Sequence, residues 1–121
     1  PGDSSVNITS RYIYEKGGVI GAVCHGPAAL TEVTLTGGSY LIDGKKFAAF
    51  TNEEETIAKL EDVVPFLLQD RLTERGGIFV SGEPWKENAV SDNRVITGQN
   101  PQSAHKVGQL IVEALRSSDK K

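Results

Sequence analysis

The tetrapeptide Cys24-His25-Gly26-Pro27 follows an unbroken run of small and apolar residues over 18–23. Such a run is typical of a strand covered on both faces in a parallel sheet, and Pro27 suits the first turn of a helix. The only cysteine of the chain therefore stands where a buried strand is expected to turn into a helix. A corner of this kind, a nucleophile elbow, exposes a side chain beside the first free N–H groups of the helix.

Composition narrows the classes of function. The 121 residues suffice for one globular unit, and no apolar stretch is long enough to span a membrane. The net charge of -3 and the lack of a Lys/Arg cluster argue against nucleic-acid binding. A single cysteine rules out an intrachain disulfide and fits a reducing compartment, so we predict a cytoplasmic protein. No motif indicates a metal ion or a nucleotide, and we predict no cofactor.

Local patterns predict the other elements. Helices are expected over 8–15, from Pro27 to Leu30, over 63–75 and from Pro101 onward, and strands over 19–23, 78–80 and 94–97. The Asp43-Gly44 pair predicts a hairpin between residues 40–42 and 45–50. Asn52 and Asn100 are expected to cap helices. The apolar face of the last helix is predicted to comprise Ala104, Val107, Ile111, Ala114 and Leu115.

This order of elements predicts an α/β sandwich with at least one parallel crossover. A doubly wound sheet usually has about five strands, and three strands plus a hairpin fall short of that number. We therefore interpret residues 1–116 as the carboxyl-terminal portion of a single domain and residues 117–121 as a polar tail. The amino-terminal strands would be missing from this chain or supplied by another one.

Three segments resemble the ThiJ/PfpI superfamily: residues 17–30, which include the cysteine, residues 50–55 and residues 94–104. The sequence looks most like the branch of glutathione-independent glyoxalases and chaperone-like stress proteins, and class I glutamine amidotransferases are more distant relatives. The resemblance implies a flavodoxin-like fold with a mostly parallel sheet, usually dimeric. It also implies a glutamate near the start of the domain that hydrogen-bonds the cysteine, and a glycine-rich loop before the elbow. Neither lies in these residues.

Cys24 is the predicted nucleophile. A lone cysteine is often an inert buried hydrophobe, but the flanking strand, glycines and proline favour a reactive one. A helix amino terminus and a nearby imidazole are expected to lower the pKa of the thiol. The same helix terminus and imidazole would also make the thiol oxidisable. Gly26 is predicted to support the elbow and its oxyanion pocket.

His25 and Glu55 are the predicted partners of the thiol, on the resemblance. From the residues alone, His25 is as consistent with a structural histidine beneath the loop as with acid–base work. With Asn52 as the cap, Glu55 would instead complete a capping box. His105 is expected to be a surface or packing residue, and Trp85 either lines the mouth of the site or covers an edge of the core.

The resemblance and the elbow together predict a cofactor-independent cysteine enzyme that converts methylglyoxal-type dicarbonyls to hydroxy acids. The substrate would be a small dicarbonyl, and a homodimer is expected. Two alternatives remain open, a stress-response holdase chaperone and a cysteine hydrolase related to amidotransferases.

Overall fold

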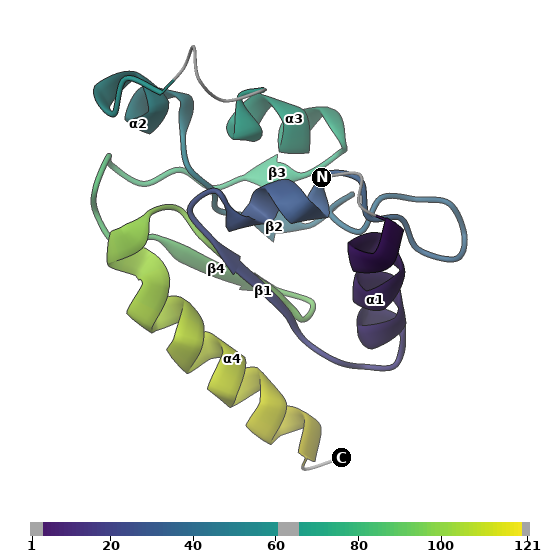
Figure 1. The fold of residues 1–121 in the computed structure, drawn as a ribbon. Coiled ribbons are helices and arrows are strands. Elements are labelled where there is room, and N and C mark those ends of the chain that lie inside the picture. The colour runs from purple at the N-terminus through teal and green to yellow at the C-terminus, as the bar shows by residue number, and fades with distance from the viewer. Residues whose placement is uncertain (1–3, 61–65, 120–121) are drawn as a thin grey trace.

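The computed structural model describes residues 4–60 and 66–119 (Figure 1). In chain order the elements are α1 (Ser4–Glu15), β1 (Ile20–Val23), the 3-10 helix η1 (Gly26–Leu30), β2 (Lys46–Phe47), α2 (Asn52–Ile57), α3 (Leu68–Glu74), β3 (Ile78–Phe79), β4 (Ala89–Asp92), β5 (Val95–Gly98), the 3-10 helix η2 (Pro101–Ser103) and α4 (Ala104–Asp119). Within these residues, no helix combines the length and apolarity that a membrane span requires.

The strands form two small sheets. In the first, β5 lies between β1, which runs parallel to it, and β4, which runs antiparallel. In the second, β2 and β3 are parallel. Helix α4 packs against the three-stranded sheet, whereas α1, η1 and α3 lie on the other side of the strands (Figure 1). The α/β class and the parallel pairing are confirmed, but the strands among the described residues do not form one continuous sheet.

Burial differs between β5, the inner strand of the first sheet, and β1, one of its two outer strands. All four residues of β5 are buried, because this strand has a neighbour on each side. Strand β1 was expected to be covered throughout, yet Gly21 is exposed, and β1 has no strand partner on its outer edge among the described residues. A side chain at Gly21 would come within 2.5 Å of Ile111 Cδ1, so glycine allows the close approach of α4.

The predicted hairpin around Asp43-Gly44 is wrong. The turn exists, with Gly44 at φ +76°, but β2 pairs with β3 rather than with the segment before the turn. Leu41, Ile42 and Phe47 on both sides of the turn are fully buried, so they lack the alternation of a half-exposed hairpin. They belong to the core instead.

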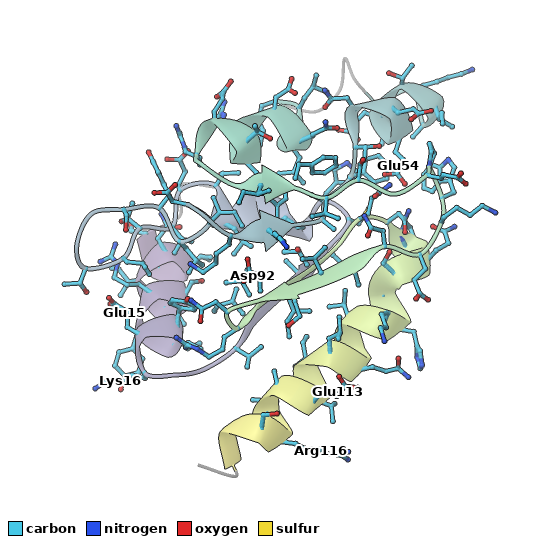
Figure 2. The ribbon with its side chains drawn as sticks, turned by 180° about the vertical axis from the view of Figure 1, so that it is seen from behind. Glu15, Lys16, Glu54, Asp92, Glu113 and Arg116 are labelled. Carbon is cyan, nitrogen blue, oxygen red and sulfur yellow. The ribbon has the colours of Figure 1, made fainter. Side chains whose placement is uncertain are left out.

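A hairpin occurs where none was predicted, between β4 and β5. Asn93 and Arg94 both have positive φ angles, +46° and +68°, as a tight hairpin turn requires. Asp92, at the end of β4, accepts a hydrogen bond from the backbone N–H of Lys46 at 2.7 Å. Its side chain thereby links the two sheets, and it lies near the strands in Figure 2.

Several predicted helices shift at their ends. Helix α1 begins earlier than residue 8, and α3 begins at Leu68 because Leu67 is extended; residues 63–65 of the predicted helix lie outside the described part. The helix after the elbow is a 3-10 helix. Helix α4 continues to Asp119 through part of the predicted tail. On its predicted apolar face Val107 is buried, whereas Ala104 and Leu115 are exposed.

Candidate active site

Cys24 occupies a sharp corner between β1 and η1. Its φ angle is +62°, a left-handed conformation that residues other than glycine rarely adopt. The backbone on both sides is fixed, because Cys24 N–H donates to Gly98 O at 2.9 Å and Phe50 N–H donates to Cys24 O at 3.0 Å. The side chain is half-buried. This is the strained strand-to-helix turn that the sequence predicts for an elbow.

His25 lies between the thiol and a buried carboxylate. Its Nδ1 is 3.7 Å from Cys24 Sγ, and its Nε2 is 2.6 Å from Glu55 Oε1. Because the carboxylate accepts a hydrogen bond from the Nε2–H group, the lone pair of a neutral imidazole lies on Nδ1, which faces the thiol. The structure thus brings together the three predicted residues, hereafter the Cys24 cluster: Cys24, His25 and Glu55.

Glu55 does not complete a capping box, contrary to the alternative that the sequence left open. The cap of α2 is Thr51, not Asn52, and its box partner is Glu54, the third residue of the helix. Glu55 is one position further on, so its side chain is available to His25. The His25 side chain is 40% exposed, whereas that of Glu55 is 1% exposed. A buried carboxylate beneath a half-exposed imidazole fixes the orientation of the ring.

The thiol itself is less acidic than predicted. Burial raises the pKa of Cys24 most, a hydrogen bond from the backbone of His25 lowers it by a smaller amount, and the nearby carboxylates of Glu54 and Glu55 raise it further. The expectation of a lowered pKa is therefore wrong. The short 3-10 helix after the corner replaces the full helix on which that expectation relied. The geometry favours transfer of the thiol proton to His25 Nδ1 during the reaction over a permanent thiolate.

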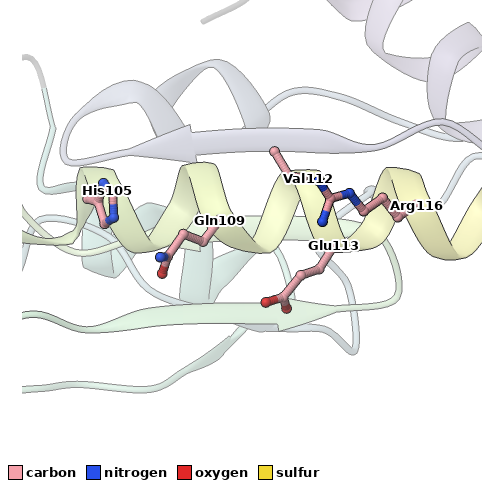
Figure 3. Close-up of a pocket in the computed structure, with 5 residues that line it drawn as sticks. All are labelled: His105, Gln109, Val112, Glu113 and Arg116. Atoms are coloured by element: carbon pink, nitrogen blue, oxygen red, sulfur yellow. The ribbon is translucent and has the colours of Figure 1, made fainter.

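The remaining sequence candidates lie as follows. Gly26 is exposed and opens η1 directly after His25, and its role in an oxyanion pocket stays a prediction. His105 lies on the outer side of α4 in a shallow surface depression with Gln109, Val112, Glu113 and Arg116 (Figure 3). It takes no part in the Cys24 cluster. The described residues include no group of three or more potential metal-binding side chains of His, Cys, Asp or Glu.

Sequence reasoning missed two residues beside the site. Phe50 packs on the His25 ring with centroids 4.3 Å apart, and Glu54 is a fully buried carboxylate. The signal for Glu54 was present, since Thr51-Asn52-Glu53-Glu54 matches the Ser/Thr-x-x-Glu pattern of a capping box. No local pattern indicates the contact between Phe50 and His25.

Fold and site together define an α/β protein with a cysteine–histidine–glutamate cluster at a strand-to-helix corner. Comparison with known proteins identifies its relatives. The chain is 36% identical over 108 residues to "Glyoxalase 3" of Candida albicans, a match covering 84% of this chain and 46% of that protein. It is 34% identical over 111 residues to "Glutathione-independent glyoxalase HSP31" of Saccharomyces cerevisiae, covering 87% and 47%. No family model matches the chain.

A solved structure shares this fold. The Rapid Encystment Protein 24 KDa of Francisella tularensis superposes with a TM-score of 0.92 at 43% identity, over 95% of this chain and 51% of that one. These relatives confirm the resemblance to the glutathione-independent glyoxalases and to the ThiJ/PfpI superfamily that the sequence predicts. It spans about half the length of the curated relatives it matches.

Proposed function

We propose that this chain carries the nucleophile of an enzyme that converts small dicarbonyls of the methylglyoxal type into hydroxy acids without a cofactor. The observation that supports the proposal most is the geometry of His25, with Nδ1 3.7 Å from Cys24 Sγ and Nε2 2.6 Å from Glu55 Oε1. This arrangement occurs in a chain whose relatives are named glyoxalases. Glu55 orients His25, and His25 accepts the thiol proton.

The reaction begins when Cys24 Sγ bonds to the aldehyde carbon while its proton passes to His25 Nδ1. The former carbonyl oxygen then takes that proton from His25, and the product is a hemithioacetal. A base then removes the hydrogen from the former aldehyde carbon and a proton is returned to the neighbouring carbon, while the hydroxyl proton on the first carbon moves to the oxygen of the second. The first carbon is oxidised to a thioester and the second is reduced to an alcohol, so no external oxidant or reductant is needed. Water cleaves the thioester, which releases the hydroxy acid and the thiol.

The base for the carbon-bound hydrogen is either His25 or a residue outside this chain. Once His25 has received the thiol proton it cannot also serve as the base until it gives that proton away. A carboxylate from the part of the relatives that this chain does not span would remove this conflict. Activity is therefore expected to depend on the amino-terminal half of the domain.

The test is product formation from methylglyoxal, followed by NMR detection of lactate. The chain is assayed alone and after co-expression with the part of the Candida albicans relative that lies outside the matched region. Lactate is expected from the combination, at a rate well above that of either part. Methylglyoxal loss without lactate, or no loss with both parts folded and associated, contradicts the proposed reaction.

A holdase chaperone is the second candidate, and exposed apolar side chains favour it. Ile8 and Tyr12 lie one turn apart on α1 and are 59% and 63% exposed. A holdase would suppress the aggregation of an unfolding client protein, followed by light scattering, equally well with Cys24→Ser. Replacing Ile8 and Tyr12 by serine would abolish the protection. A homodimer is a further prediction, and the oligomeric state of the same preparations tests it.

A further inference from the structure

Glu54 is a buried carboxylate whose hydrogen bonds come from three separate segments. Oε1 accepts from the backbone N–H and hydroxyl of Thr51, at 3.1 Å each, and from Gln99 Nε2 at 3.0 Å. Oε2 accepts from the backbone N–H of Trp85 at 3.0 Å and from Asn100 Nδ2 at 2.9 Å. Burial alone would raise the pKa of Glu54, but these hydrogen bonds outweigh it and the pKa is lowered. Glu54 is labelled near α2 in Figure 2.

The same residues fix the loop around Trp85 from several sides. Trp85 has a φ angle of +59°, a strained conformation for a tryptophan. Asn100 Nδ2 donates to Lys86 O at 2.7 Å, and Gln99 Nε2 donates to Gly82 O at 3.1 Å. Such strain persists only where the surroundings determine the backbone. We call Glu54, Gln99 and Asn100 the Glu54 anchor.

The indole of Trp85 continues a row of rings that begins at His25. The rings of His25 and Phe50 are 4.3 Å apart, and those of Phe50 and Trp85 are 5.5 Å apart in an edge-to-face arrangement. Phe50 is buried, whereas Trp85 is partly exposed. Since the backbone of Phe50 also bonds to Cys24 O, the row is tied to the elbow itself.

We propose that Trp85 is a specificity-determining residue that forms one wall of the Cys24 site, and that Glu54 is the positioning residue that holds this wall. The wall admits electrophiles with small substituents and hinders planar aromatic ones. The inference rests on the proposed function for its substrate class. The test of the wall needs no turnover, so the role of Trp85 and the proposed reaction can each fail without the other.

The effect of Trp85 on access to Cys24 can be measured because the chain has one cysteine, which the reagents label, and one tryptophan, which gives the fluorescence signal. N-methylmaleimide and N-phenylmaleimide share a reactive group and differ in size, and intact mass follows their rates of addition to Cys24. In Trp85→Ala the ratio of the phenyl to the methyl rate is expected to rise about tenfold. Trp85→Phe, the matched control, keeps an aromatic wall and should change the ratio less than threefold. An unchanged ratio in Trp85→Ala overturns the wall.

The role of the Glu54 anchor is tested with Glu54→Gln, which would place an amide N–H donor opposite the N–H donors of Trp85 and Asn100. The rate ratio should rise as in Trp85→Ala, and acrylamide quenching of the Trp85 fluorescence should increase about twofold. Glu53→Gln, on the exposed side of the same helix, is the matched control and should change neither. If Glu54→Gln does not fold, Asn100→Ala removes one donor to Glu54 and is expected to increase the quenching. Wild-type quenching and ratio in a folded anchor variant overturn the role of Glu54.

Discussion

Glu54 and Glu55 are neighbours on α2 and both are fully buried, yet their surroundings differ sharply. Both oxygens of Glu54 accept hydrogen bonds, from Thr51, Trp85, Gln99 and Asn100. In contrast, Glu55 Oε1 bonds to His25, and Oε2 has no hydrogen-bond partner among the described residues. A carboxylate saturated by donors fixes the backbone, whereas a carboxylate bound to one half-exposed imidazole is suited to tuning a reactive group.

The largest expected effect on stability follows from Glu54→Gln. This substitution leaves buried donors of the Glu54 anchor without an acceptor, so the free energy of unfolding should fall by about 3 kcal/mol. Urea unfolding measures it, with Glu53→Gln as the control. A loss below about 0.5 kcal/mol would show that the saturated carboxylate is not what holds this region.

Glu55→Gln should reverse the pattern, with turnover affected more than folding. The glutamine side chain can still accept from His25 but stabilises an imidazolium less, so kcat should fall by about 30-fold. The free energy of unfolding is expected to change by less than about 1 kcal/mol. Steady-state kinetics and urea unfolding of one preparation check both. If Glu55→Gln unfolds the protein as readily as Glu54→Gln does, the contrast between the two carboxylates is lost.

Acid should destabilise the protein partly through Glu54. The pKa of Glu54 in the folded state lies below its ordinary value of 4.5, so the unfolded state binds more protons as the pH falls. The contribution of Glu54 to stability is therefore present above about pH 4.5 and is lost as the pH falls through the folded pKa. The free energy of unfolding of Glu54→Gln should depend less steeply on pH between 3 and 5. Equal slopes in both proteins would be inconsistent with an ionised buried Glu54.

The smallest expected effect concerns the thiol. Burial and the two carboxylates raise the pKa of Cys24 above its ordinary value of 9.0, so alkylation by iodoacetamide should accelerate with pH and reach its midpoint above 9.0. Intact mass follows the reaction. A midpoint near or below neutrality would reveal a thiolate stabilised by imidazolium, and would restore the expectation from the sequence.

Sequence alone predicted the elbow because its determinants are local. An apolar strand, one cysteine and a proline at the start of the next helical turn are consecutive in the chain. The cap of α2 was misplaced by one residue, because Thr51 and Asn52 are both good caps. The choice depends on tertiary contacts, since Asn52 N–H donates to Gln69 Oε1 at 3.0 Å and Asn52 Nδ2 donates to Asp70 at 3.0 Å.

Pairing between distant segments accounts for the other errors. The Asp43-Gly44 turn was identified, but the partner of β2 is β3, a strand from much later in the chain. Asn100 does occupy the predicted N-cap position before Pro101, but its side chain makes no capping hydrogen bond there and instead donates to Glu54 and Lys86 O. An asparagine is equally suited to capping a nearby helix and to donating hydrogen bonds to distant segments, so a single sequence does not distinguish the two roles.

The most direct test of the Cys24 cluster is the kcat/KM for methylglyoxal of Cys24→Ala, measured in the preparation that forms lactate. The substitution removes the atom that bonds to the aldehyde and leaves the Glu54 anchor intact. A fall on the order of 10³-fold or more, with unchanged unfolding, is the predicted result. Turnover within tenfold of the wild-type rate would contradict it.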